Sequence, residues 1–197
     1  ISAADAISDL LAENKPRIDC IDPKSPAGYQ EVRYLAPITA YQKLMHDGCD
    51  GPMDSIRLAR HTDEVRARFK KILEECIRGV PLNEKARQRL GIKKHRTHPM
   101  AACEPAPTIT TLPDDILHYA EPRILTVRES ARLQSFPDWF RFCGKFTTGG
   151  SLRTKECPRY TQVGNAVPPL LGRSIGAALL ATIDEIDSRV RQTSSNG

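Results

Sequence analysis

PRILTVRESARLQSFPD, at residues 122–138, carries the clearest local signal in this 197-residue chain. Thr126 and Glu129 have the spacing of a capping box, in which each side chain satisfies an unpaired backbone N–H at a helix N-terminus. Apolar residues continue the helical pattern to Leu133, and Phe136-Pro137 ends it because proline cannot continue a helix. The stretch therefore predicts a short, well-capped helix followed by an abrupt turn.

Two further elements are predicted between this helix and the C-terminus. Tyr160–Val167 is expected to be a strand that enters a tight turn. Pro168-Pro169 then opens a long helix, because proline is well placed in a first helical turn. The apolar side of this long helix is formed by Leu170, Leu171, Ile175, Leu179, Ile183 and Ile186. Trp139 and Phe140, directly after residues 122–138, are expected to be core residues.

Upstream of residue 122, two helices and a strand are expected. The first helix is capped by Thr62, with acidic residues in its first turn, where the helix dipole favours them, and it ends near Gly79. A second helix runs from Glu84 to Leu90. Thr108–Leu112 is short and rich in β-branched residues, which predicts a strand.

The N-terminal part has weaker signals. Ala6–Leu11 predicts a short amphipathic turn, and Lys15–Pro52 reads as an ordered loop or linker with one strand near Val32–Leu35. These signals divide the chain into three regions with bounds 1–52, 53–120 and 121–197. The chain begins at Ile1 rather than methionine, so we expect its true N-terminus to be missing or processed.

Composition excludes several classes of protein. The hydrophobic fraction is 40%, and we find no apolar run near the roughly 20 residues needed to span a bilayer, so no membrane partner is expected. Six cysteines occur without a C-x-x-C pair, so we expect no metal site. Nothing indicates secretion, and free thiols in a reducing cytoplasm are the default expectation.

Positive charge is concentrated in one region. Between Arg57 and His98 there are 13 Lys+Arg and 5 Asp+Glu, a net charge of +8, whereas the whole chain carries +5. Such a stretch suits the phosphate backbone of DNA, because neutralising phosphates releases counterions. Charge alone favours a solvated, arginine-rich helix surface equally.

Three segments together resemble one family. Residues 122–138 are similar to the ninth conserved motif of the DNA cytosine C5-methyltransferases, and QVGNAVPP at 162–169 is similar to the tenth. PAPTIT at 105–110 resembles the short threonine-containing signature that ends the family's target-recognition region. The order of the segments also agrees. The resemblance implies a mixed α/β fold, with a small target-recognition domain and C-terminal motif helices that complete an S-adenosylmethionine-dependent methyltransferase domain. It implies that residues 1–52 are a linker with the start of the target-recognition region, that 53–120 are the main DNA-binding recognition region, and that 121–197 return to the catalytic domain.

The resemblance also implies roles for individual residues. The cofactor-binding candidates are Gly164, Asn165, Ala166 and Val167, which in the family lie beside the S-adenosylmethionine pocket. Taken alone, Gly164-Asn165 would indicate only a turn before a helix. The ninth-motif residues Arg123, Thr126, Arg128, Glu129 and Gln134 are expected to be structural, without acid–base work.

The DNA-binding candidates lie upstream of the ninth motif. Thr108 and Thr110 offer small hydroxyl groups that suit phosphate contacts. At least one of these threonines is expected to be an ordinary strand residue. Lys93, Lys94 and Arg96 are plausible groove or phosphate contacts.

The family's catalytic parts are absent from the sequence. Its nucleophile is a cysteine that follows a proline, and none of the six cysteines does so. The Glu-Asn-Val motif and the Phe-x-Gly-x-Gly loop are also missing. We therefore expect no catalytic residue in this chain, and we expect those motifs to lie before residue 1. The chain alone should not transfer methyl groups.

Two hypotheses follow. The first is the C-terminal half of a restriction–modification or orphan methyltransferase, which needs an N-terminal catalytic half and duplex DNA as partners. The second is a non-enzymatic DNA-binding or specificity subunit, or a decayed fragment. In the first case the long C-terminal helix would pack on a sheet of the missing half. In isolation it would expose Leu171, Ile175 and Leu179.

Overall fold

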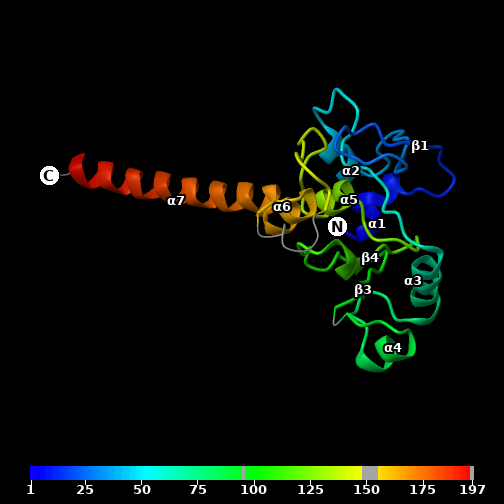
Figure 1. Ribbon diagram of the computed structural model, residues 1–197. Coiled ribbons are helices and arrows are strands. Elements are labelled where there is room, and N and C mark those ends of the chain that lie inside the picture. The colour runs from blue at the N-terminus through cyan, green and yellow to red at the C-terminus, as the bar shows by residue number, and fades with distance from the viewer. Residues whose placement is uncertain (95, 148–154, 196–197) are drawn as a thin grey trace. The chain divides into compact units, whose positions relative to one another are not determined.

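The computed structural model describes residues 1–94, 96–147 and 155–195. It consists of helices with two very small sheets (Figure 1), which confirms the mixed α/β class. The elements in chain order are α1 (Ala3–Ile7), η1 (Ser8–Leu10), β1 (Arg17–Asp19), β2 (Gln30–Val32), α2 (Ala40–His46), α3 (Asp63–Glu75), α4 (Glu84–Arg89), β3 (His98–Pro99), η2 (Pro113–Asp115), β4 (Ile116–Leu117), α5 (Val127–Leu133), α6 (Arg159–Asn165) and α7 (Pro169–Ser195). The chain forms two compact units, Ile1–Ala166 and Val167–Gly197. This division concerns compactness, and the three functional regions bounded at 52 and 120 remain a prediction.

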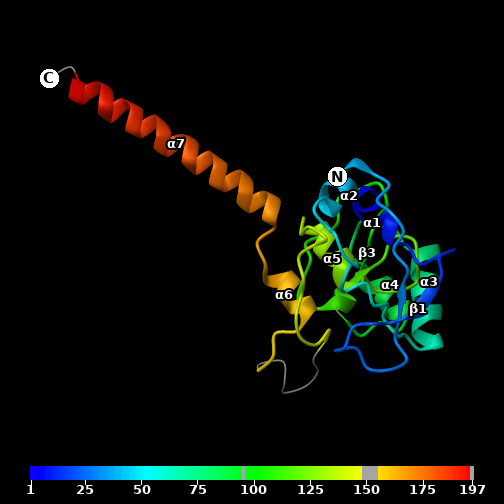
Figure 2. The ribbon, with the colours of Figure 1, turned by 90° about the horizontal axis from the view of Figure 1, so that it is seen from above.

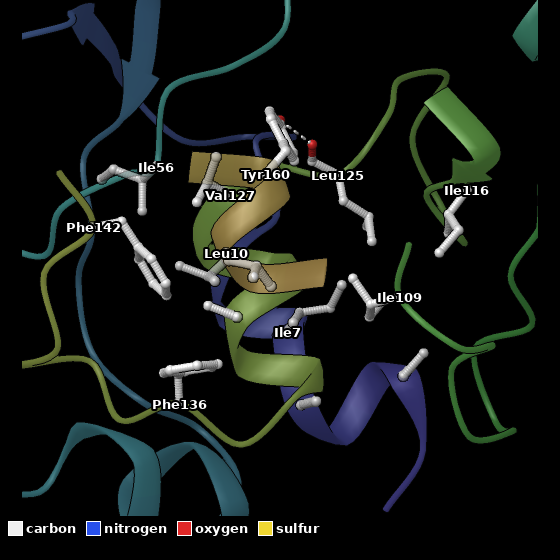
Figure 3. Packing of buried hydrophobic residues seen from close by; sticks show 14 of the residues in the cluster. Ile7, Leu10, Ile56, Ile109, Ile116, Leu125, Val127, Phe136, Phe142 and Tyr160 are labelled. Atoms are coloured by element: carbon white, nitrogen blue, oxygen red, sulfur yellow. Dashed lines mark hydrogen bonds between the residues drawn. The ribbon is translucent and has the colours of Figure 1, made fainter. Parts of the chain in front are cut away.

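Helix α5 lies at the centre of the first unit. Its predicted capping box is confirmed: Thr126 accepts a hydrogen bond from the Glu129 N–H, and the Glu129 side chain accepts one from the Thr126 N–H. Helices α1 and α6 both pack against α5. Figure 3 shows apolar side chains from these three helices and from the adjoining loops meeting in one core, with Ile7, Val127 and Tyr160 among them.

Residues Ala3–Leu10 contribute to this core, and the short amphipathic turn predicted at Ala6–Leu11 is found as the end of α1 and η1. Ala3, Ala6, Ile7 and Leu10 are all buried, and α1 is held to a distant segment by the hydrogen bond from the Ala3 N–H to the Glu104 carbonyl (2.8 Å). The sequence signal was weak because this stretch is too short to show a helical period. Only its packing partners, far along the chain, reveal it as core.

The sheets are small. β1 pairs antiparallel with β2, with Arg17 opposite Val32, and β3 pairs parallel with β4, with His98 opposite Ile116. The strand predicted near Val32–Leu35 is found at Gln30–Val32. The strand predicted at Thr108–Leu112 is wrong: the segment has no strand assignment, and nearby prolines limit ladder pairing.

The expectation for Tyr160–Val167 was also wrong, because α6 covers most of this segment. The aromatic and β-branched residues suggested a strand. However, Tyr160 and Val163 are three residues apart, fall on one face of the helix and are both buried in the core. The helical period, rather than β propensity, therefore describes how this segment packs.

Helices α3 and α4 adjoin a second, smaller hydrophobic cluster, which is formed by Ile72 and Leu73 of α3, Leu82 just before α4 and Leu117 of β4. Their predicted N-caps are confirmed, since Thr62 accepts from the Val65 N–H and Asn83 from the Ala86 N–H. α3 ends at Glu75, before the predicted stop near Gly79. The Gly79 N–H instead donates to the Pro99 carbonyl at 2.8 Å, so this glycine serves the chain reversal towards β3.

The second unit contains α7, which confirms the predicted long helix after Pro168. Leu171, Ile175 and Leu179 are each at least half exposed on it. By length and composition alone, Arg159–Arg189 is long and apolar enough to cross a membrane, which corrects the expectation that no such segment exists. Core helices of soluble proteins pass the same test, so this observation gives little weight to a membrane role.

Candidate functional site

The ninth-motif segment holds a buried cluster of charges around Glu129. The Arg123 guanidinium donates to both Glu129 carboxylate oxygens at 2.7 Å and to Glu121 at 2.8 Å. Burial alone would raise the pKa of Glu129. The charge and hydrogen bonds of Arg123, aided by His118 and the Thr126 N–H, reverse this effect and lower the pKa to about 2. Glu129 therefore stays ionised and is unsuited to proton transfer near neutral pH.

His118 completes this cluster as a neutral ring. Its Nδ1 accepts hydrogen bonds from the backbone N–H groups of Ala120 and Glu121, so the ring proton lies on Nε2, which faces Glu129 Oε1 at 3.6 Å. Burial lowers the pKa of His118 to about 4, despite the opposing effect of Glu129. The imidazole is therefore uncharged at physiological pH.

The two arginines of α5, Arg128 and Arg132, are fully buried and paired within the fold. Arg132 donates to Asp138 at 2.6 Å and to Asp9 at 2.9 Å, which ties α5 to the N-terminal segment. Arg128 pairs with Asp54 and donates to the carbonyls of Pro137 and Phe140. These contacts join loops on both sides of α5, and they describe a scaffold rather than a reactive centre.

Helix α6, from the tenth motif, packs directly on the PAPTIT segment. A Cβ atom on Gly164 would lie 2.5 Å from the Thr110 carbonyl carbon and 2.6 Å from the Thr111 nitrogen, so only glycine permits this approach. Gln134 donates to the Val163 carbonyl, and the Tyr160 hydroxyl donates to the Leu125 carbonyl at 2.6 Å (Figure 3). The three motif segments, far apart in sequence, thus form one junction.

The cofactor candidates lie at the end of this junction. The closest neighbour of Gly164 is the backbone of Thr110, whereas the sequence had suggested a role in ligand approach. Asn165 is exposed with an amide that offers both a donor and an acceptor, and Ala166 is the half-buried C-cap of α6. Val167 is exposed and belongs to the second unit. The boundary between the two units thus divides the four candidates.

The DNA candidates fall into two groups. Lys93, Arg96 and Thr108 are exposed. Lys94 forms ion pairs with Asp114 and Asp115, and the Thr110 hydroxyl donates to Asp115 at 2.9 Å, so both are engaged within the fold. A half-open groove of about 450 Å³ lies beside them, lined by Lys94, Thr111, Tyr160 and Thr161 among others. In this groove Lys94 and residues 111–114 face residues 158–161 at the start of α6.

Sequence reasoning missed the carboxylates that pair with α5. Glu121 could have been found, because it lies two residues before Arg123. Asp9 and Asp54 carry no local signal, since they lie 123 and 74 residues from their partners. Trp139 and Phe140 were both expected to be core, but they are 56% and 38% exposed. Among the described residues, no group of three or more potential metal ligands occurs.

Comparisons with known proteins place this architecture in a class. The model of the C-5 cytosine-specific DNA methylase family matches residues 12–181, which is most of the chain. The protein therefore belongs to the C-5 cytosine-specific DNA methylase family.

Its relatives include bacterial and plant enzymes. Type II methyltransferase M.DdeI of Desulfomicrobium norvegicum is 31% identical over 88% of this chain and 41% of its own length. Type II methyltransferase M.AquIB of Picosynechococcus is 45% identical over 42% of this chain and 63% of its own length. DNA (cytosine-5)-methyltransferase CMT2 of Arabidopsis thaliana is 45% identical over 39% of this chain and 5% of its own length. The chain thus matches less than two thirds of the length of each of these relatives.

A solved structure shares the fold. It is described as a DNA modification methyltransferase encoded within an E. coli prophage, and it superposes with a TM-score of 0.54 over 93% of this chain and 47% of that chain. The sequence identity is 20%, so this likeness concerns the fold alone.

Proposed function

We propose that this chain is the C-terminal, DNA-recognising part of a cytosine C5-methyltransferase of the restriction–modification type. The complete enzyme would transfer a methyl group from S-adenosylmethionine to carbon 5 of cytosine in a short duplex site. The observation that carries the proposal is the junction at Gly164, where the tenth motif, the ninth-motif helix and the end of the recognition region pack together. Such an enzyme would act on DNA in the cytoplasm.

The proposal divides the work between this chain and a catalytic half. Attack on carbon 6 of an extruded cytosine needs a thiolate. No cysteine of this chain follows a proline, as the family's nucleophile does. The nucleophile would therefore come from an N-terminal half. M.AquIB supports a divided arrangement, because an 89-residue alignment covers 63% of it and that relative is itself shorter than this chain.

S-adenosylmethionine, when bound, would supply the methyl group. The residues of this chain that fit its edge are Asn165, Ala166 and Val167, because the Asn165 amide is exposed and able both to donate and to accept. Gly164 would act indirectly by fixing where α6 ends against Thr110. The catalytic half would supply the remainder of the pocket.

DNA would be held by the region around α3 and α4. Lys93, Arg96 and Thr108 are exposed, and neither Lys93 nor Arg96 forms an ion pair within the described part of the chain, which suits phosphate contacts. Lys94 and Thr110 both donate hydrogen bonds to the Asp115 carboxylate. They would therefore support DNA binding indirectly, by holding in place the wall of the groove beside Thr111.

A second candidate function is a DNA-binding specificity subunit without enzymatic activity, or a decayed fragment. The net charge of +8 between Arg57 and His98, together with the absence of the nucleophile, favours this alternative. It predicts duplex binding with no gain of methyl transfer when a catalytic half is added.

The test is a methyl-transfer assay with labelled S-adenosylmethionine and mixed-sequence duplex DNA. The chain alone, the N-terminal catalytic half alone and an equimolar mixture would be compared. We expect activity only in the mixture. Activity of the chain alone would contradict the division of labour, and DNA binding without activity in any tube would favour the specificity subunit.

Within an active mixture, Asn165→Ala tests the cofactor edge. We expect a higher KM for S-adenosylmethionine with little change in DNA affinity. Gln88→Ala, which removes another exposed amide, is the matched control. An unchanged KM in the Asn165 variant would remove this residue from the cofactor site.

A further inference from the structure

β1 and α3 lie on the side of the first unit away from α6 (Figure 2). Residues of both elements line a cleft that contains several arginines. The cleft measures about 510 Å³ and is half open to solvent. Its walls come from segments far apart in the chain: β1, the turn at Gly28–Gln30, Leu58–His61, the first turns of α3 and the residues just before the ninth motif. The lining includes none of the DNA or cofactor candidates.

The charge in this cleft is unbalanced. Arg17, Arg60 and Arg66 are exposed along its walls, and among the described residues none of the three has a carboxylate partner. Arg123 also reaches the wall, but Glu121 and Glu129 neutralise it. Glu13 is the remaining carboxylate of the lining. Three guanidinium groups therefore face one unpaired carboxylate.

His61 lies in the wall of the same cleft, where the nearby arginines affect its pKa. Its Nε2 accepts a hydrogen bond from the Ile124 N–H at 3.3 Å, which holds the ring in the wall. Burial first, and then the charges of Arg66 and Arg123, lower the pKa of His61. His61 therefore adds no positive charge of its own to the cleft near neutral pH.

We propose that this cleft binds the phosphodiester backbone of duplex DNA, as a contact separate from the residues that read the target. The inference rests on the proposed function and deepens it, because it adds a sequence-independent contact to the DNA partner. Guanidinium groups match phosphate oxygens with paired hydrogen bonds, and their spread over three segments suits an extended polyanion. The half-open form of the cleft suits a strand that passes through it, whereas a mononucleotide would favour an enclosed pocket.

The experiment measures duplex affinity against salt concentration. Fluorescence anisotropy with a mixed-sequence duplex would compare the full wild-type chain with Arg17→Gln, Arg60→Gln, Arg66→Gln and the triple variant. Arg33→Gln is the matched control, because Arg33 is exposed but does not line the cleft. All four substitutions replace exposed side chains, and equal thermal midpoints would establish that the five variants fold.

We expect each single cleft variant to lower the slope of log K against log salt by about one, and the triple variant by about three. The triple variant should bind at least about tenfold more weakly at low salt, uniformly across duplex sequences, since each lost phosphate contact removes released counterions. Arg33→Gln should keep the wild-type slope. Cleft variants with the control's slope would overturn the inference.

Two further arms identify other occupants. If wild-type chain binds deoxycytidine monophosphate, the triple variant does not, and their duplex slopes agree, the cleft holds free nucleotides and the inference is overturned. If the triple variant loses methyl transfer with the catalytic half at saturating DNA, while its duplex slope is unchanged, the cleft holds an acidic protein segment and the inference is again overturned.

The same measurements separate failure of the inference from failure of the proposed function. Absence of duplex binding by the wild-type chain would overturn both. Normal wild-type binding with unaffected cleft variants would overturn the cleft assignment alone.

Discussion

The α5 region and the α3–α4 region are both rich in arginine, but they use it in opposite ways. Arg123, Arg128 and Arg132 of the α5 region are buried and paired with carboxylates. On α3, Arg66 is exposed, and Arg68 forms only a surface pair with Glu64, one helical turn away. The same residue type thus holds the fold together in one region and remains available to an outside partner in the other.

The difference lies in where the partner carboxylates come from. Asp9 and Asp54 reach α5 from distant segments and Asp138 from the turn that follows it, and all three are shielded from solvent by the fold, so removing one arginine would strand a buried negative charge. On α3 the acidic partner is local and solvated, so its loss would cost little. Stability measurements should therefore separate the two regions.

The largest effect is expected for Arg132→Ala. This substitution would leave Asp9 and Asp138 buried without their cation, which should cost roughly 3–5 kcal/mol of unfolding free energy. Chemical denaturation of the wild-type and variant chains would measure the difference. A loss below about 1 kcal/mol would show that water or another cation replaces the guanidinium.

Acid should destabilise the α5 region through His118. The folded pKa of this ring is about 4, below its ordinary value of 6.5, so the unfolded chain binds the proton more readily than the folded chain. Stability should therefore fall as pH drops from about 6.5 to about 4, by up to about 3 kcal/mol.

The control for this pH dependence is His118→Asn, whose side-chain oxygen can replace Nδ1 as the acceptor for the Ala120 and Glu121 N–H groups. Denaturation midpoints across this pH window should be flatter in the variant. An identical pH dependence in both chains would assign the acid sensitivity to other groups. Below about pH 4.5, protonation of Glu129, whose folded pKa is about 2, should destabilise both chains.

Gly164→Ala should produce an intermediate loss, because the new Cβ would collide with the Thr110 and Thr111 backbone. Overpacking of this kind costs about 1–3 kcal/mol. Gly172→Ala is the matched control: no atom lies within 4 Å of its added Cβ, and alanine favours the α7 helix by up to about 1 kcal/mol. Thermal unfolding should move in opposite directions for the two variants. A neutral Gly164 variant would mean that the junction relaxes freely.

The smallest effect is expected for Arg68→Ala. The Arg68–Glu64 pair spans one helical turn, and its Glu64 side chain is 82% exposed, so the loss should stay below about 0.5 kcal/mol. Denaturation measurements at low and high salt would test this expectation. A loss of unfolding free energy as large as that of the Arg132 variant would show that arginines contribute equally to stability in the two regions.

Local sequence signals predicted the elements that have local causes. The caps at Thr62, Asn83 and Thr126 were found because a capping side chain and its backbone partner lie within three residues of each other. The long helix after Pro168 was also found from local signals, namely the prolines at its start and the apolar residues that recur along one side. α6 was mistaken for a strand, because its residues fit both β propensity and a short helical period. Packing against α5, which the sequence does not show, decides in favour of the helix.

The candidate site shows the same limit. The motif resemblance identified Gly164 and Thr110 separately. Their mutual contact depends on how the chain folds between them, and this cannot be read from their separation in the sequence. The arginine cleft was not anticipated either, since Arg17, Arg60 and Arg66 come from three separate segments. The roles of Asp9 and Asp54 could not be predicted either, because only the structure shows that they pair with the arginines of α5.

The approach of Gly164 to Thr110 and Thr111 has a consequence for protein engineering. The atoms that Gly164 meets belong to the backbone, so this contact places few demands on the side chains at positions 110 and 111. A recognition segment transplanted from a relative should therefore be tolerated if it rejoins the host chain at Ile109 with the same backbone course. The contact would serve as a fixed splice point for building chimaeric methyltransferases with new target sequences.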